Sequence, residues 1–253
     1  MLKPILLSLI LAASFTAQAA PVYTQTPHYD STHKKLVISS DNNHLLPLPS
    51  PYQQQIARIL ILLQQKQNDV AIQELNQLVS QTQALLAKDS RRAYAAFPDP
   101  AFALLVLVDA ANQHKQDAYL VAREWVLPLY LRAYAYIDKG DLKAAYTDLN
   151  AALQLAPFDP QVLNERGHYH ILQKNWAAAE ADFKKAQEAA KLLTSTTGGI
   201  TLQGRALRGL GYIAVERQQW DAAIAWYQQA LALNPQDHVA QSELAYAKRH
   251  RPQ

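Results

Sequence analysis

The chain has 253 residues, a formal net charge of +3, no cysteine and 49% hydrophobic residues. A charge this small does not favour nucleic acid or an anionic membrane surface as a partner. The lack of cysteine excludes thiol catalysis, thiolate metal sites and iron–sulfur clusters. Glycine is scarce, while alanine, leucine and glutamine are plentiful. This composition is typical of a helical protein, because these residues lose little rotamer freedom in a helix.

The N-terminal stretch, MLKPILLSLILAASFTAQAAP, has the pattern of a secretory signal peptide. Lys3 supplies a positive charge, Ile5–Phe15 is an apolar run, and Ala-Gln-Ala at 17–19 is a small-x-small cleavage site. The run is short for a permanent membrane anchor, which is the alternative. We therefore expect residues 1–19 to be cleaved on export, leaving a periplasmic protein with no stable membrane insertion.

Residues 20–50 are rich in Pro, Ser, Thr, His and Asn, and they show no sustained periodicity. We expect a flexible leader here. The segment KLVIS at 35–39 is the one candidate for a short extended piece. The histidines of the leader are irregularly spaced, and solvation explains them better than a metal site.

Three later segments, 127–160, 160–191 and 204–237, align as repeats. The first two are in register at a period of about 34 residues, whereas the third needs an insertion of about ten residues, at 192–203. Each segment carries small residues at the same places in its first and second helix. These positions are Ala133, Gly167 and Gly211, then Ala145, Ala179 and Ala223, then Ala152, Ala186 and Ala230. A bulky residue recurs between the last two sets, as Leu149, Phe183 and Tyr227.

These positions resemble the tetratricopeptide repeat (TPR) family, whose unit is a helix–turn–helix. The third segment is the closest match, with Leu207, Leu210 and Pro235 also in place. The first departs from the pattern at Arg132 and the second at Arg166, where a leucine is usual. The second also has Lys191 where the closing proline is expected. The resemblance implies an all-α fold, in which the repeats stack as a right-handed superhelix, an α-solenoid. A generic helical bundle with chance alanine spacing is the alternative.

The spacing has a physical reason. Antiparallel helices approach closely only where small side chains face each other, so Ala133 and Ala145 should meet inside one hairpin. Asp141 can cap the second helix, and Pro157 ends it. Pro160 suits the first turn of the next helix, where a missing N–H costs nothing.

The flanking segments show weaker patterns. We predict degenerate helical hairpins over 51–126, namely one at 51–88 and a second pair of helices at 99–126 with Ala118 as its small residue. Residues 91–98 are a predicted connector, and 192–203 is a predicted Thr/Ser/Gly surface loop that either tolerates insertion or contacts a partner. Residues 238–253 are predicted to form a capping helix and tail.

The sequence lacks the common catalytic motifs, namely H-E-x-x-H, G-x-S-x-G, S-x-x-K and the P-loop. We therefore predict a protein that is not an enzyme and that needs no cofactor or metal. His168 and His170 are two residues apart on a predicted helix and should lie on different faces, so they do not make a metal pair. Close helix contact explains Gly209 and Gly211 better than a nucleotide loop.

The family resemblance implies a concave groove, lined by the first helices, that binds peptides or protein segments. Aromatic and arginine side chains are enriched at binding hot spots. The alignment of the three repeats places the candidate groove residues on their first helices. They are Tyr130, Tyr134, Asn164, His168, Arg205, Arg208 and Tyr212. Some family members clamp a C-terminal carboxylate with Lys, Asn and Arg, but only Asn164 and the two arginines match here. The alternative is that these side chains only cover neighbouring helices.

The leading hypothesis is a non-catalytic scaffold or adaptor in the bacterial cell envelope, with a protein or peptide partner and no nucleic acid. The alternative is an accessory subunit of an envelope polysaccharide or secretion apparatus, which contacts a glycan or an enzyme. Glycan binding should depend on Tyr130, Tyr134 and Tyr212, whereas binding of an acidic peptide should depend on Arg205 and Arg208.

Overall fold

The computed structural model divides the chain into two compact units, Met1–Pro157 and Phe158–Gln253, which are described one at a time. The expected signal peptide, at 1–19, lies outside the residues that the structure describes. These are residues 26–30, 32, 35–39, 51–88, 92–96, 100–114, 117–193 and 197–252.

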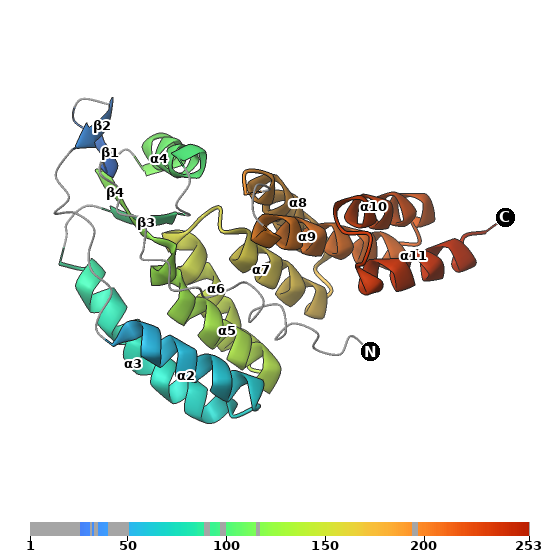
Figure 1. The fold of residues 1–253 in the computed structure, drawn as a ribbon, viewed down its shortest axis with the longest axis horizontal. Coiled ribbons are helices and arrows are strands. Elements are labelled where there is room, and N and C mark those ends of the chain that lie inside the picture. Colours follow the sequence, from blue (N-terminus) through green and yellow to red (C-terminus); the bar gives the residue numbers. More distant parts are fainter. Residues whose placement is uncertain are drawn as a thin grey trace. The chain divides into compact units, whose positions relative to one another are not determined.

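The first unit contains two helical hairpins. One consists of α2 and α3, the other of α5 and α6, and α3 packs against α5 (Figure 1). Helix α4 and a short 3₁₀ helix, η2, lie between the hairpins in sequence. The bounds are α2 Tyr52–Gln64, α3 Asn68–Leu86, α4 Pro100–His114, η2 Arg123–Val126, α5 Leu127–Lys139 and α6 Leu142–Leu155.

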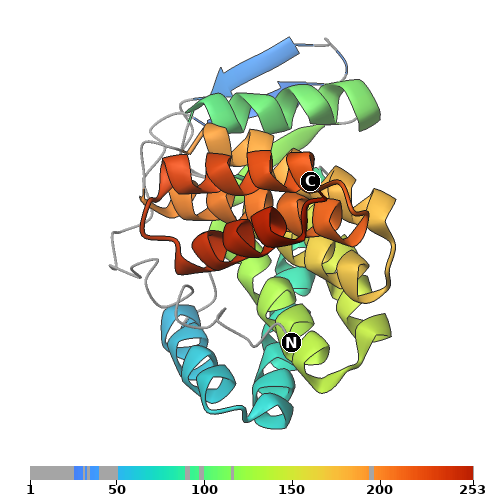
Figure 2. The same cartoon turned by 90° about the vertical axis from the view of Figure 1, so that its right-hand side faces the viewer.

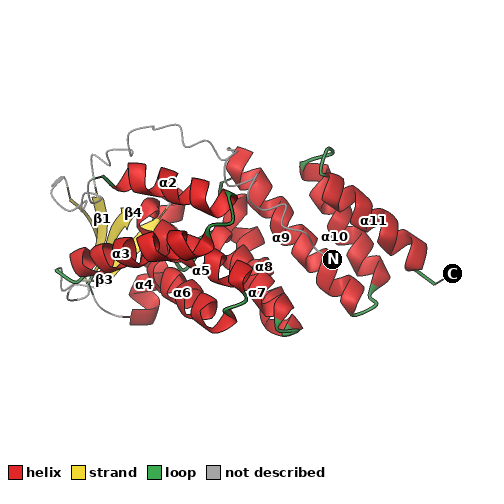
Figure 3. Cartoon of the chain, turned by 90° about the horizontal axis from the view of Figure 1, so that it is seen from below, coloured by secondary structure: helices red, strands yellow, loops and turns green. Residues whose placement is uncertain are grey.

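The first unit also contains a four-stranded sheet, whose strands are yellow in Figure 3. The order of the strands is β2-β1-β4-β3. Strands β3 and β4 are parallel, and α4 forms the crossover between them. Strand β1 is antiparallel to both β2 and β4. Helix α4 packs against β1, β3 and β4 (Figure 2). The bounds are β1 Thr26–Asp30, β2 Lys35–Ser39, β3 Arg92–Ala96 and β4 Ala118–Ala122.

The sheet corrects several sequence predictions. The predicted helix around Ala118 is wrong, because residues 118–122 form β4 and not a helix. The predicted connector contains β3, and the predicted flexible leader contains β1 and β2. Strand β2 coincides with the candidate extended piece at 35–39. Strands β3 and β4 are short, apolar and largely buried in parallel pairing. Such strands show no alternation of polar and apolar residues, so their pattern is the same as that of a buried helix.

The second unit is helical throughout its described residues. Each of its helices packs against the next, and α7 also contacts α9 (Figure 1). Helix α11 packs against α10 at the predicted position of the capping helix. The bounds are α7 Pro160–Leu172, α8 Trp176–Lys191, α9 Thr197–Glu216, α10 Trp220–Leu233 and α11 His238–His250. The predicted stack of helix–turn–helix repeats is therefore confirmed, and the sheet of the first unit is an addition to it.

The predicted loop at 192–203 is a helix over most of its length, because α9 already begins at Thr197. The insertion therefore lengthens the first helix of the third repeat. Gly199 allows this, since a Cβ there would lie 2.0 Å from the carbonyl oxygen of Leu193. A side chain at this position would push the first turn of α9 away from the end of α8.

The turn inside each hairpin is the same. Gly140 follows α5 with a φ of 81°, and the equivalent Lys174 and Gln218 also adopt left-handed angles, of 54° and 57°. Lys66 has the matching angle, 61°, between α2 and α3. A left-handed residue ends one helix and reverses the chain into the next. The α2–α3 hairpin therefore shares its turn geometry with the three repeats.

The predicted cap at Asp141 is confirmed, and side chains also cap three other helices. The Asp141 carboxylate accepts a hydrogen bond from the Ala144 N–H at 3.1 Å at the start of α6. Asn175 caps α8 and Asp237 caps α11 in the same way. Asp159 accepts from two backbone N–H groups at the start of α7, next to Pro160. These caps satisfy donors that the helices leave free.

Glycines allow the closest helix contacts in the second unit. The ring of Phe183 on α8 lies against both Gly167 on α7 and Gly209 on α9, where an added Cβ would come within 2.8 and 2.6 Å of ring carbons. Tyr227 on α10 lies against Gly211 in the same way, at 2.5 Å. The predicted role of Gly209 and Gly211 in close helix contact is confirmed.

Candidate functional site

Tyr130 and Tyr134, the two predicted groove residues of the first unit, are buried. Their exposed fractions are 1% and 6%. Helix α5 packs against α6, α3 and η2, so little of its surface is left for a ligand. The prediction that these two tyrosines present their rings on a surface is therefore wrong.

The other predicted groove residues lie on α7 and α9 of the second unit, and Asn164 is the most deeply buried of them, with an exposed fraction of 0%. Its side-chain amide donates a hydrogen bond to the carbonyl oxygen of Leu202 at 3.0 Å. Leu202 belongs to the inserted first part of α9. Asn164 therefore joins α7 to α9, and one of its two amide N–H donors is already used.

Glu165 is a buried carboxylate between α7 and α9, with an exposed fraction of 1%. Its Oε2 lies 2.8 Å from Arg205 Nη2, and its Oε1 lies 3.5 Å from His168 Nδ1. Burial raises the pKa of this carboxyl, but Arg205 and His168 more than offset that effect and lower the pKa to about 2. Glu165 is therefore ionised at neutral pH and acts as the counterion of Arg205.

Arg208 also has an internal counterion. Its guanidinium contacts the carboxylate of Asp237, the residue that caps α11. Both arginines that the sequence offers to an acidic ligand are therefore neutralised within the second unit. The sequence interpretation missed Glu165 and Asp237, because neither carboxylate is near its arginine in sequence.

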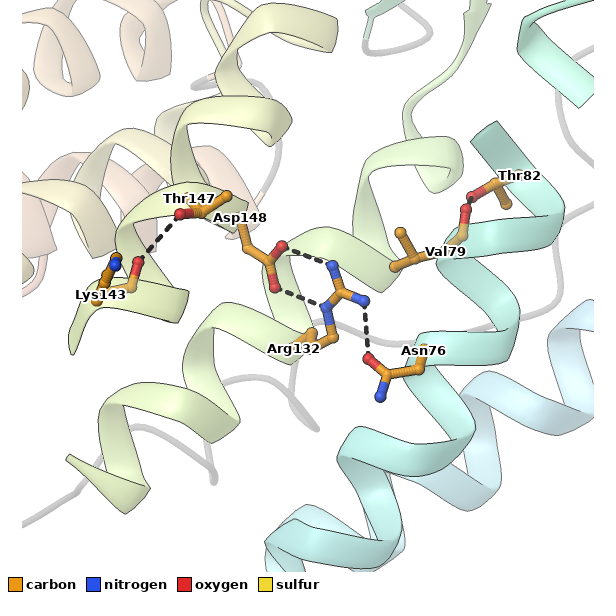
Figure 4. A network of polar contacts seen from close by, with 7 residues as sticks. All are labelled: Asn76, Val79, Thr82, Arg132, Lys143, Thr147 and Asp148. Atoms are coloured by element: carbon orange, nitrogen blue, oxygen red, sulfur yellow. Dashed lines mark hydrogen bonds and ion pairs between the residues drawn. The ribbon is translucent and has the colours of Figure 1, made fainter. Parts of the chain in front are cut away.

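A second set of ion pairs recurs from repeat to repeat. Arg132 on α5 makes a bidentate pair with Asp148 on α6, with N–O distances of 2.7 Å, and also donates to Asn76 on α3 at 2.8 Å (Figure 4). Arg166 on α7 makes the same bidentate pair with Asp182 on α8, at 2.7 and 2.8 Å. These arginines stand where the TPR pattern usually has a leucine, and the ion pairs explain why an arginine is accepted there.

His168 and His170 contact different carboxylates. His170 Nε2 lies 3.7 Å from the Asp182 carboxylate, whereas His168 faces Glu165. Burial lowers the pKa of His170, and Arg166 lowers it further against the opposing effect of Asp182. Within the described ranges, no group of three His, Cys, Asp or Glu side chains is placed to hold a metal ion.

Tyr212 is the predicted groove residue that keeps a half-exposed aromatic ring. Its ring centroid lies 6.5 Å from that of Trp176, at the start of α8. Burial raises the pKa of its hydroxyl, and Glu216, one helical turn further along α9, raises it as well. His168 and Tyr212 occupy matching positions of α7 and α9, so one face of the second unit carries both.

None of the helices described is both long and apolar enough to cross a lipid bilayer.

Comparison with known proteins identifies repeats in two segments. Residues 128–159 match the family described as tetratricopeptide repeat, and residues 211–248 match the one described as TPR repeat. The human cell division cycle protein 16 homolog is 26% identical over 143 residues, which cover 55% of this chain and 23% of that protein. The mouse homolog matches to the same extent. The chain thus spans less than a quarter of the length of these relatives.

Two solved structures illustrate the similarity. MamA RS-1, as a double mutant, is 15% identical with a TM-score of 0.47, and the match covers 81% of this chain and 87% of that one. The first TPR of Spaghetti (RPAP3), bound to an HSP90 peptide, is 22% identical with a TM-score of 0.40, and the match covers 49% of this chain and 93% of that one. The segments 128–159 and 211–248 of this chain are tetratricopeptide repeats.

Proposed function

We propose that this chain is a non-catalytic scaffold or adaptor, which binds a protein segment on the α7–α9 face of the second unit. TPR repeats generally serve as interaction modules, and two segments of the chain are such repeats. The observation that carries the proposal is the position of His168 and Tyr212. Both are partly exposed at matching places of two neighbouring first helices.

We also propose export to the bacterial cell envelope, on the basis of the signal-peptide pattern at 1–19. Cell fractionation and the intact mass of the purified protein test this part. A periplasmic protein that lacks residues 1–19 is expected, whereas a full-length cytoplasmic protein would contradict it.

Site-specific photo-cross-linking tests the binding face. A photoreactive phenylalanine at position 212 should cross-link a protein partner in native cells. The same residue at position 146 is the matched control, because Tyr146 is an exposed tyrosine on a second helix, α6. Cross-links that form equally at both positions, or at neither, would contradict the proposed face.

The glycan-binding alternative loses its main support, because two of its three tyrosines, Tyr130 and Tyr134, are buried. Tyr212 with Trp176 is a single aromatic pair, which other ligands could use equally well. The scaffold is therefore the function that the geometry favours.

A further inference from the structure

Helix α11 continues the repeat pattern of the second unit. The tetratricopeptide segment 211–248 includes most of this helix, and Tyr246 follows Tyr212 by 34 residues, the length of one repeat. Ala245 therefore corresponds to Gly211, the small residue of α9. Helix α11 also packs against both α9 and α10. It is thus built like the first helix of a further repeat, in addition to covering α10.

Matching positions of the three first helices α7, α9 and α11 carry rings. They are His168, Tyr212 and Tyr246. The first two are partly exposed, and Tyr246 is the most exposed of the three, at 43%. Helix α9 contacts both α7 and α11, so the rings form a row with Tyr212 in the middle (Figure 1). The proposed binding face therefore extends by one helix, to α11.

The Tyr246 ring is held in a fixed orientation. It stacks on His250, with ring centroids 4.0 Å apart, and His250 in turn stacks on Trp220 at 6.1 Å. The Nδ1 atom of His250 donates a hydrogen bond to the carbonyl oxygen of Tyr246 at 2.9 Å. A side chain that is already positioned loses little freedom when a ligand packs against it. Tyr246 therefore has the properties of an anchor for a ligand.

The charges around the row balance. Within one helical turn of the three rings, the glutamate and the arginine of α7 each have a counterion, and so does Arg208 of α9. The remaining charged side chains there are two acids and two bases, namely Glu216, Glu243, Lys248 and Arg249. The row therefore has no net charge, and it gives no electrostatic advantage to a strongly acidic or strongly basic segment.

The spacing of the row matches one peptide conformation. Helices packed side by side lie about 8–10 Å apart, so successive rings should recur at that distance. A polyproline II segment has three residues per turn and presents the same side about every 9 Å. An extended β-strand repeats its side after about 7 Å, which fits less well. Residues i, i+3 and i+6 of a polyproline II segment would therefore reach the three rings in turn.

We propose that the row of His168, Tyr212 and Tyr246 binds an uncharged, proline-containing segment of the partner in the polyproline II conformation. Grooves lined by aromatic rings recognise such segments, because the polyproline II helix is preformed and little entropy is lost on binding. Tyr246 is the binding residue that this proposal adds. The inference rests on the proposed function, and it specifies the chemistry of the partner.

Fluorescence anisotropy of a labelled decaproline peptide, titrated with the purified protein, tests the proposal. Tyr246→Ala should weaken binding at least about fivefold, because an anchoring ring is removed. Tyr246→Phe keeps the ring and should bind within about twofold of the original chain. Tyr146→Ala is the matched control, because Tyr146 is an exposed tyrosine on α6, and it should leave binding unchanged. A circular-dichroism melt of Tyr246→Ala shows that a loss of binding is not a loss of folding.

Two unlabelled competitor peptides test the spacing. Both contain three prolines and six glutamines, but one has a proline at every third position and the other has the prolines in one block. The spaced peptide should compete at least about fivefold better, since the block can reach only one ring at a time. Equal competition by the two peptides would contradict the match to the row.

Two results would overturn the proposal as a whole: no binding of decaproline, or binding that Tyr246→Ala leaves unchanged. The cross-linking experiment separates this proposal from the proposed function. If position 212 captures a partner but decaproline does not bind, only the polyproline chemistry is wrong. If both experiments fail, the binding face itself is wrong.

Discussion

At matching positions of two neighbouring hairpins, α7–α8 places Arg166 opposite Asp182, whereas α9–α10 has Leu210 and Trp226. Trp226 packs against the cluster that contains Leu210, Phe183 and Ile213. The α5–α6 hairpin of the first unit has the ion pair, as Arg132 and Asp148. The same backbone arrangement therefore accepts either a charged or an apolar pair between its two helices.

The two kinds of pair contribute to stability in different ways. A largely buried ion pair gains little net stability, because desolvation cancels most of the attraction, but removing one partner leaves a costly unpaired charge. The guanidinium also has a fixed geometry, and Arg132 uses it to bind Asp148 and Asn76 at once. An apolar pair has no such directionality and contributes through buried area.

The largest effect should come from breaking one ion pair. Asp182→Ala leaves Arg166 without its carboxylate, and we expect a loss of about 3–5 kcal/mol in the free energy of unfolding. Urea denaturation at pH 7 measures it. Asp221→Ala is the control, because it breaks an exposed pair with Arg251 and should change stability by less than about 0.5 kcal/mol. Equal losses in the two variants would show that burial of the pair does not matter.

The ion pair between Glu165 on α7 and Arg205 on α9 should make the free energy of unfolding depend on pH. The pKa of Glu165 is lowered from 4.5 to about 2 in the folded state, so its contribution is present above pH 4.5 and is lost as the pH falls toward 2. Glu165→Gln should cost about 3 kcal/mol at pH 7, and this deficit should shrink by about 2 kcal/mol at pH 3. Urea midpoints of both proteins at the two pH values measure it. A deficit that is the same at both values would mean that Glu165 is not ionised in the fold.

The glycine contacts test the apolar side of the comparison. Gly211→Ala places a Cβ within 2.5 Å of the Tyr227 ring, and we expect a loss of about 1–3 kcal/mol from overpacking. Gly204→Ala is the matched control on the same helix. Its Cβ would meet nothing closer than 3.8 Å, so higher helix propensity should stabilise the protein by about 0.5–1 kcal/mol. The melting temperatures of the two variants should shift in opposite directions. Two shifts of the same sign would contradict the close contact between Gly211 and Tyr227.

The smallest effect should come from exchanging one kind of pair for the other. Arg166→Leu together with Asp182→Trp copies the α9–α10 pair into α7–α8. We expect a stability within about 1 kcal/mol of the original chain, because no charge is left unpaired. The double variant would thus be far more stable in urea than Asp182→Ala alone. A double variant as unstable as that single one would show that this hairpin requires the ion pair.

The helical repeats could be predicted because their signals are local. Alanines and glycines recur at fixed positions, and Asp141 and Asn175 stand where a cap is needed. Strands β3 and β4 could not be predicted, because they are short, buried and rich in alanine. Their pattern fits a helix as well as a parallel strand, and only the pairing across α4 decides between them.

The candidate site was predictable only in part. Register placed His168 and Tyr212 on one face, but it could not show that Tyr130 and Tyr134 are covered by their own unit. The ion pairs had a signal that the sequence interpretation did not use. Arg132 and Arg166 recur at the repeat spacing, and so do Asp148 and Asp182. Two unrelated changes from the family pattern would not place a matching aspartate in both repeats.

The sheet has a consequence for how the first unit folds. Its hairpins join residues that are close in sequence, so they can form early and independently. The β1–β4 ladder instead pairs Tyr29 with Ala118, about ninety residues apart, and must wait for a large loop to close. We expect biphasic refolding, in which helical signal recovers first and protection of the β4 amides from hydrogen exchange comes last.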